Sequence, residues 1–148
     1  MSYSIRVRAT GIVIENDSIL LIKYDDDNGI HYNLPGGGVQ EGESIIQALK
    51  RELKEEADID IDAGSLVFTT EYIGKIHNLA LFFECKLKEG SYPRMPETRD
   101  DFQIDVEWVH HSKLKDIKIY PEFISNDLFI KYMQDKKWNN DLFIIYHY

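Results

Sequence analysis

The spacing of apolar residues along the chain predicts a mixture of strands and helices. Runs rich in β-branched and aromatic residues, bounded by turn residues, predict strands at 5–14, 18–24, 32–34, 66–72, 76–87 and 106–109. Turn residues at 15–18 predict a hairpin between the first two strands. Apolar residues three and four positions apart predict helices at 45–57 and 121–136, and the charged, proline-containing segment 88–103 predicts a loop.

The helix at 45–57 carries signals for its start and for its buried side. Ser44 is a good N-cap, and Gln47 three residues later completes a capping box. At about 100° per residue, its apolar side chains fall within roughly 80° of Leu53 and form a core-facing stripe. Glu52 and Glu56 lie at the margin of that stripe, whereas ordinary solvated glutamates would lie opposite it.

Three carboxylates of this helix, Glu52, Glu55 and Glu56, share one face, because residues three and four positions apart are neighbours. Two charges about 5 Å apart repel by roughly 3 kcal/mol at an effective dielectric constant near 20. A divalent cation is the usual compensation, so the three glutamates are candidate metal ligands. The alternative is a solvated helix face with salt bridges such as Arg51 with Glu55.

The loop before the helix, 34–43, contains three consecutive glycines. Glycine lets a ligand approach the main chain closely, and a carbonyl of Gly36 or Gly37 is a suitable oxygen ligand for a hard cation. A plain turn between a strand and a helix is the alternative. The loop lacks the Gly-Lys-Ser/Thr ending of a nucleotide P-loop. The acidic segment 25–29 lacks the ligand spacing of an EF-hand and predicts a hairpin tip.

Together, the loop and the helix resemble the Nudix box, the 23-residue signature of the MutT-like Nudix hydrolase family. The matching positions are Gly37, Glu43, Arg51, Glu52, Leu53, Glu55, Glu56 and Ile59. Asp58 stands where the family has a helix-ending glycine, and Asp tolerates the left-handed conformation expected there. We therefore expect Asp58→Gly to be slightly stabilising. The resemblance implies an α+β fold, an α/β/α sandwich with a mixed β-sheet on which the box loop and helix pack.

The resemblance also implies hydrolysis, with Mg²⁺ or Mn²⁺, of a pyrophosphate bond in a nucleotide or in a nucleoside diphosphate linked to another group. The implied catalytic residues are Glu52, Glu55 and Arg51, and the implied metal ligands are Glu52, Glu55, Glu56, Gly36 and Gly37. Glu52 is the foremost candidate for a general base. Arg51 is placed to orient a glutamate by a bidentate bond, with Glu43 as a candidate partner. Glu43 is also a candidate for the substrate site.

Candidates outside the box are less specific. Arg6 and Arg8 alternate on the first strand and face one side, either as substrate contacts or as an exposed strand face. Four acidic residues could supply a further carboxylate: Glu97, Asp100, Asp101 and Asp105. Trp108, Tyr32 and Phe83 are candidates to stack on a base, although core packing is the stronger expectation. The histidines at 31, 77, 110 and 111 lack metal-ligand spacing, which favours structural or surface roles.

Composition bounds the class of protein. The chain has 148 residues, which favours one domain over 1–148, and its net charge of −9 argues against nucleic-acid and membrane-surface binding. No apolar run has membrane-spanning length. The single cysteine, Cys85, cannot form an internal disulfide and favours a reduced, cytoplasmic setting. The apolar end at 142–148 is expected to pack on the domain or on a second copy of the chain in a homodimer.

Two other classes of function compete with a hydrolase. The chain could be a Nudix-fold nucleotide-binding or regulatory domain without turnover, although such domains usually lose box glutamates and this chain keeps them. It could also be a structural cation-binding protein, which pyrophosphate release would exclude. Residue marks that distinguish the ADP-ribose and diadenosine-polyphosphate subfamilies are absent around 74–77. The sequence therefore predicts a small nucleotide substrate without identifying it.

Overall fold

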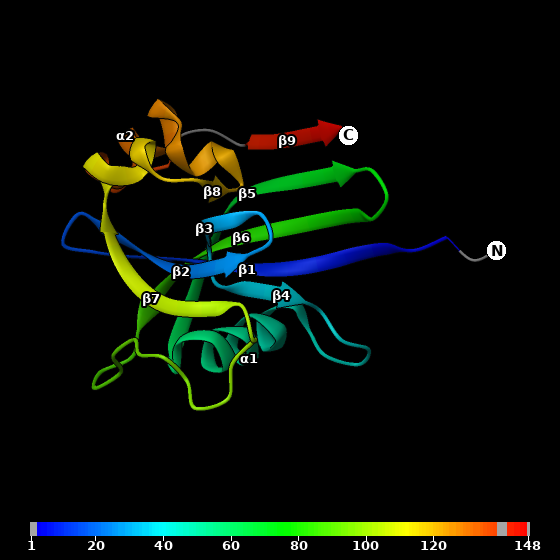
Figure 1. Cartoon of the computed structure of the whole chain (residues 1–148), viewed down its shortest axis with the longest axis horizontal. Coiled ribbons are helices and arrows are strands. Elements are labelled where there is room, and N and C mark those ends of the chain that lie inside the picture. The colour runs from blue at the N-terminus through cyan, green and yellow to red at the C-terminus, as the bar shows by residue number, and fades with distance from the viewer. Residues whose placement is uncertain (1–2, 139–141, 148) are drawn as a thin grey trace.

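Strand β1 (Ile5–Glu15) lies at the centre of the structure, a computed structural model that describes residues 3–138 and 142–147. Its nine residues Ile5 to Val13 pair in parallel with β6 (His77–Leu87). On its other edge, β1 pairs antiparallel with β4 (Gly36–Gly38) and, at its end, with β2 (Ser18–Asp26). One strand therefore joins both halves of a mixed sheet, as Figure 1 shows.

The remaining elements complete the sheet and cover it. Its strand order is β8-β3-β2-β1-β6-β5-β9, with β4 on β1 and β7 on β2. The further strands are β3 (Gly29–Asn33), β5 (Ile61–Ile73), β7 (Gln103–His110), β8 (Ile119–Tyr120) and β9 (Leu142–His147). The helices are α1 (Ile45–Ala57), α2 (Asp127–Asp135) and the 3₁₀ turns η1 (His111–Asp116) and η2 (Glu122–Ser125).

Two hydrophobic cores form because helices cover the sheet from opposite sides (Figure 1). On one side Leu49 and Leu53 of α1 are fully buried, with Cys85 packed nearby as a small apolar side chain. On the other side α2 and η2 bring Phe129 and Phe123 against Phe68 of β5. This mixed sheet between helices confirms the α+β sandwich predicted from the sequence.

Helix α1 begins and ends as its sequence predicts. The Ser44 hydroxyl accepts from the backbone N–H of Gln47 at 3.0 Å, and the Gln47 side chain accepts from Ser44 N–H at 2.7 Å. Asp58 ends the helix in the left-handed region, with φ 53° and ψ 40°, and donates its N–H to the Lys54 carbonyl. Both capping expectations are confirmed.

The expected single helix over 121–136 is wrong. Asn126 interrupts it with an extended backbone (φ −76°, ψ 147°), and its side chain accepts from Leu128 N–H at 2.9 Å as the N-cap of α2. The segment is thus η2 followed by α2, because an asparagine side chain satisfies a helix start better than it fits a helix interior. The loop expected at 34–43 also contains a short strand, β4, which pairs with β1.

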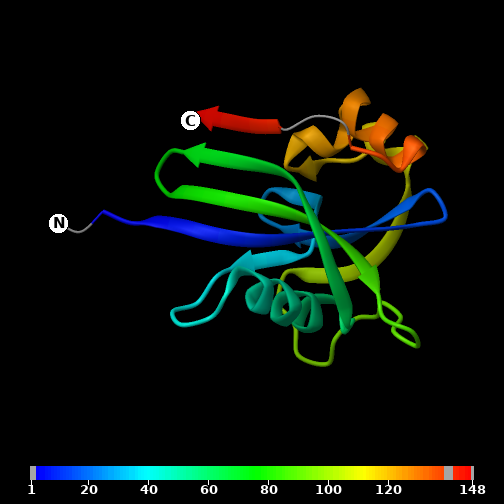
Figure 2. The ribbon, with the colours of Figure 1, turned by 180° about the vertical axis from the view of Figure 1, so that it is seen from behind.

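The apolar end of the chain packs on the domain. Strand β9 pairs in parallel with β5 from Phe68↔Leu142 to Ile73↔His147, and Tyr148 lies outside the described residues. In Figure 2 the start of β1 and the end of β9 lie at the same end of the molecule. No helix in the described part of the chain has the length and apolarity needed to cross a bilayer.

Asp58 makes contacts that a glycine could not make. Its carboxylate pairs with Lys54 at 3.3 Å and also with Arg94, whose backbone N–H donates to the Ala57 carbonyl at 3.0 Å. These hydrogen-bonded cations lower the pKa of Asp58, Arg94 being the larger cause. The loop after β6 is thereby fastened to the end of α1, so the gain expected from glycine is opposed by the loss of these pairs.

We predict that Asp58→Gly raises the melting temperature less, or lowers it more, in the wild-type background than in an Arg94→Ala background. The reason is that the Arg94→Ala background has already lost the ion pair between Asp58 and Arg94. Thermal melts of the four proteins in this double-mutant cycle measure the difference. An identical shift in both backgrounds would show that the Arg94 pair contributes nothing.

Candidate active site

The glycine run lets strand β4 lie directly against helix α1. Gly36, Gly37 and Gly38 pair with Thr10, Ala9 and Arg8 of β1, and a Cβ on Gly37 would stand 2.4 Å from the Glu52 carboxylate. A Cβ on Gly36 would stand 2.4 Å from the Ala9 carbonyl. The glycines therefore permit a close approach of main chain and carboxylate, which places the Glu52 side chain against the β4 backbone.

Arg51 binds the loop to the helix. Its guanidinium makes a bidentate contact with Glu43, at 2.7 and 3.1 Å, and donates to the Gly38 carbonyl at 3.0 Å. The remaining nitrogen reaches Glu52 at 2.9 Å and Glu55 at 3.3 Å. The expected pairing of Arg51 with Glu43 is therefore present, and it lowers the pKa of Glu43. Part of the repulsion among the box carboxylates is offset by this arginine.

Glu56 turns inward, away from Arg51. The backbone N–H of Gly36 donates to one carboxylate oxygen at 3.0 Å, and the Tyr24 hydroxyl donates to the other at 3.2 Å. Burial is the main cause that raises the pKa of Glu56, to about 8, and the nearby Glu52 charge adds to the rise. Glu56 is thus a buried acid that favours its protonated form until a positive charge comes close.

The three glutamates do not surround one point. Glu55 lies on the exposed side with Arg51, whereas Glu56 faces the loop, and no cluster of three Asp, Glu, His or Cys side chains is gathered for a metal within residues 3–138 and 142–147. The donor types nevertheless fit Mg²⁺ or Mn²⁺, because Glu52 and Glu56 are hard oxygen donors close enough to raise the pKa of Glu56. A cation binding there would displace the Glu56 proton.

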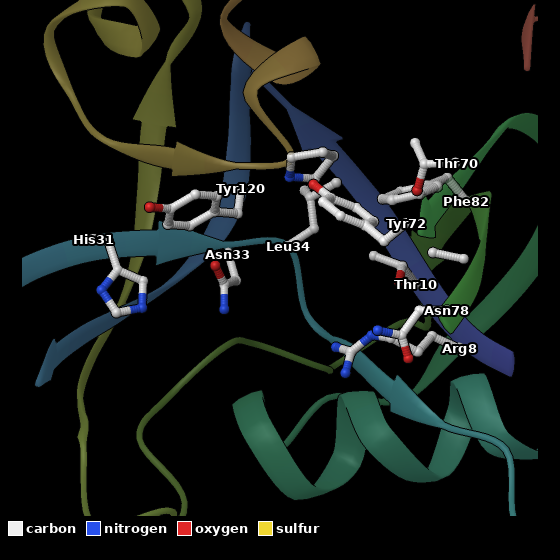
Figure 3. Close-up of a pocket in the computed structure, with 12 residues that line it drawn as sticks. Arg8, Thr10, His31, Asn33, Leu34, Thr70, Tyr72, Asn78, Phe82 and Tyr120 are labelled. Carbon is white, nitrogen blue, oxygen red and sulfur yellow. The ribbon is translucent and has the colours of Figure 1, made fainter. Parts of the chain in front are cut away.

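A cavity of about 340 Å³ lies beside the box (Figure 3). Arg8 and Thr10 enter it from β1, and these two residues pair with Gly38 and Gly36 of the box loop. Aromatic rings complete much of its wall: Tyr72, Phe82, Tyr120 and His31. The same strand therefore contributes to the cavity and supports the carboxylate site.

Three polar residues of the cavity wall have an unpaired oxygen. Asn33 Oδ1, Asn78 Oδ1 and Thr70 Oγ1 are buried and find no hydrogen-bond partner among the described residues. A buried polar atom without a partner costs about 1–3 kcal/mol, so such groups are usually satisfied by water or by a ligand. Figure 3 shows the side chains of these residues on three separate strands around one space. The cavity wall therefore combines aromatic and aliphatic side chains with several convergent polar groups, which suits binding of a small molecule.

The other candidates from the sequence are dispersed. Arg8 lines the cavity, whereas Arg6 is exposed and lies beside Gly38. The proposed base-stacking residues lie elsewhere: Tyr32 and Phe83 pack with the cores, and Trp108 is 38% exposed on β7. Burial is the main cause that raises the pKa of the Tyr24 hydroxyl, Glu56 adds to the rise, and the late-loop carboxylate Asp100 contributes after them. Another late-loop carboxylate, Asp105, accepts from Val106 N–H.

The histidines divide into two groups. His77 contacts Glu71 at 2.7 Å and His110 caps η1, which fits the structural roles expected for them. His31, in contrast, is buried in the cavity wall, so the expectation of a purely structural role overlooked its position. A polar residue on the core-facing side of a strand, as Thr70 is, was the available signal for the cavity, since such positions are normally apolar.

Comparisons with known proteins bear on the family and the fold. The family model of the NUDIX domain matches residues 5–127. Nucleoside triphosphatase NudI of Escherichia coli O139:H28 is 31% identical over 113 residues, which cover 66% of this chain and 77% of that protein. A NUDIX hydrolase from Nitrosomonas europaea superposes with a TM-score of 0.74 at 19% identity, over 99% and 82% of the chains. An ADP-ribose pyrophosphatase from Streptococcus suis superposes with a TM-score of 0.66 at 16% identity, over 95% and 98%.

The buried Glu56 predicts a pH-dependent stability in the absence of metal. Its folded pKa, about 8, lies above its ordinary value of 4.5, so its contribution to stability is complete below pH 4.5 and is lost as the pH rises through 8. With a chelator present, raising the pH from about 6 to about 9 should lower the melting temperature of wild type more than that of Glu56→Gln.

The exposed neighbour provides the control for this measurement. Glu55→Gln removes one carboxylate from the same helix but leaves the buried one, so its melting temperature should follow the wild-type pH dependence. Parallel pH profiles for wild type and Glu56→Gln would mean that Glu56 titrates as an ordinary carboxyl.

Proposed function

The chain belongs to the Nudix hydrolase family, and from this premise we propose that it hydrolyses a pyrophosphate bond of a small nucleotide, using Mg²⁺ or Mn²⁺. The observation that carries the proposal is the placement of the Arg51-bound glutamates and the cavity on the two sides of the β1–β4 pairing. A pyrophosphate at the glutamates and a nucleoside in the cavity would be held by adjacent parts of one structure.

We assign the cation to Glu52 and Glu56, with the carbonyl of Gly36 or Gly37 and with Glu55 as a further ligand. A divalent cation held there would neutralise phosphate charge and would lower the pKa of a water molecule. As the alternative to holding the cation, Glu52 is the candidate general base, because it lies against the β4 backbone next to the cavity strand. Arg51 holds Glu52 in place. Glu43 has its two oxygens engaged by Arg51 and Gln40 N–H, so we assign it to positioning Arg51 and not to substrate contact.

The net charge of −9 repels an anionic nucleotide. Positive side chains near the site offset this repulsion locally. Arg8 lines the cavity, and Arg6 lies beside the box loop at Gly38. Arg51, although closest to the glutamates, is engaged with four partners. We propose that Arg8 contacts the phosphate nearest the nucleoside, and that Arg6 attracts the phosphates from the rim.

The volume of the cavity limits the size of the substrate group that it can hold. Ligand pockets span roughly 300–1,000 Å³, and the cavity, at about 340 Å³, is near the lower end. It therefore suits one nucleoside, which favours a nucleoside triphosphate or a nucleoside diphosphate derivative over a substrate with two buried nucleosides. The similar proteins NudI, a nucleoside triphosphatase, and the Streptococcus suis ADP-ribose pyrophosphatase represent these two kinds of substrate. The lone, buried Cys85 supports a reducing, cytoplasmic setting.

A binding or regulatory domain without turnover is the second candidate. It is disfavoured because the chain keeps every box glutamate and holds three of them, Glu43, Glu52 and Glu55, with Arg51. Hydrolysis of nucleoside triphosphates, nucleoside diphosphate sugars and dinucleotides, incubated with Mg²⁺, separates the two. The products to measure are phosphate or pyrophosphate from the triphosphates, and a nucleoside monophosphate with its second phosphate ester from the other substrates. Binding without release would support the regulatory domain.

We predict that Glu52→Gln lowers kcat by at least about a hundredfold, the usual scale for losing a positioned base or ligand, while circular dichroism remains native. Glu41→Gln is the matched control, because Glu41 is exposed in the same loop and should turn over like wild type. Native structure with a near-normal rate for Glu52→Gln would remove Glu52 from the catalytic residues.

A further inference from the structure

Tyr24 connects strand β2 to the buried glutamate of the box. Its hydroxyl donates to Glu56 Oε2 at 3.2 Å, while the backbone N–H of Gly36 donates to Oε1 at 3.0 Å. One donor thus comes from a side chain and one from the main chain, and together they engage both oxygens. A carboxylate held at both oxygens has a fixed plane, whereas one held at a single oxygen can rotate about that contact.

The ring of Tyr24 is itself held from the cavity side. It stacks on the His31 imidazole, with ring centres 5.5 Å apart and planes 13° from parallel. His31 in turn meets the Tyr120 ring edge-on at 5.7 Å, and both of these residues line the cavity. A row of three rings therefore extends from the cavity wall to Glu56. Figure 3 shows the cavity end of this row, with His31 and Tyr120 on neighbouring strands.

We propose that Tyr24 is a positioning residue for the reaction: through its hydroxyl it sets the orientation of the Glu56 carboxylate toward the cation, and through its ring it ties that carboxylate to the cavity. The inference rests on the proposed function, because it gives Tyr24 a role only if Glu56 is a ligand. Tyr24 lies outside the box, so the box pattern alone does not assign it.

One substitution distinguishes the role of the Tyr24 hydroxyl from the packing of its ring. Tyr24→Phe keeps the ring, and with it the stack on His31, but removes the donor to Glu56. A hydrogen bond to a charged group is worth about 1.5–3 kcal/mol, which corresponds to a factor of about ten or more. The loss should therefore appear in metal binding and in kcat, whereas the cavity, and hence KM for the nucleotide, should be little changed.

The chain contains a matched control. The Tyr132 hydroxyl donates to Glu84 Oε1 at 2.5 Å, so Tyr132→Phe also removes a tyrosine–glutamate bond, but between α2 and β6, outside the box and the described cavity wall. Both variants lose one hydroxyl from a largely buried ring. Their effects on stability should be similar, and their effects on function should differ.

The experiment measures three quantities for wild type and both variants: the Mn²⁺ dissociation constant by titration without nucleotide, kcat and KM on the wild-type substrate, and the melting temperature. For Tyr24→Phe we expect about tenfold weaker Mn²⁺ binding, kcat lower by about tenfold or more, and KM within about twofold. Tyr132→Phe should bind Mn²⁺ and turn over like wild type, even if its melting temperature falls.

Tyr24→Phe with Mn²⁺ affinity and kcat within about twofold of wild type would overturn the proposal, as would losses of the same size in Tyr132→Phe. Failure of the proposed function is a separate result, because wild type itself would then hydrolyse no nucleotide of the panel. In that case the Mn²⁺ titration still decides whether Tyr24 positions Glu56.

Discussion

The contacts of the Arg51 guanidinium hold together the parts of the site that the backbone brings near each other. Its planar fork meets Glu43 with two bonds, and its remaining donors reach the Gly38 carbonyl, Glu52 and Glu55. A lysine could not make this set, because an ammonium group lacks the bidentate geometry. Arg51 therefore joins the loop to the helix, and its positive charge reduces the electrostatic repulsion among the neighbouring glutamates.

Strand β1 imposes the second constraint. Because it pairs with β4 on one edge and β6 on the other, its residues Arg8 and Thr10 take part in the box support and in the cavity wall. The glycines of β4 are needed for this arrangement, since a side chain at Gly37 would collide with Glu52. The box glutamates and the proposed nucleoside cavity are thus both supported by one strand pairing, and Tyr24 adds a third connection from β2.

Local signals explain what the sequence could predict. The capping box at Ser44, the unbroken helix formers and the left-handed Asp58 depend on neighbouring residues, so α1 and its ends follow from the chain itself. The break at Asn126 was missed because an apolar period passes over a residue whose side chain caps a new helix. The helical pattern places Glu56 at the margin of the buried stripe, but its contact with Tyr24 depends on β2, and the cavity depends on β3, β5 and β6 meeting across the sheet. No local pattern specifies those long-range contacts. Polar residues on buried strand positions, such as Thr70, were the available hint.

The most direct test of this account is the rate of nucleotide hydrolysis with Mg²⁺ in Arg51→Lys, compared with Arg94→Lys. Both substitutions keep a positive charge. Arg51 lies on α1 and pairs with the box glutamates, whereas Arg94 pairs with Asp58 at the end of α1, outside the glutamate site. We expect Arg51→Lys to lose at least about tenfold in kcat with its fold intact, while Arg94→Lys stays near wild type. Equal, near-normal rates for the two variants would contradict the central role of the Arg51 contacts.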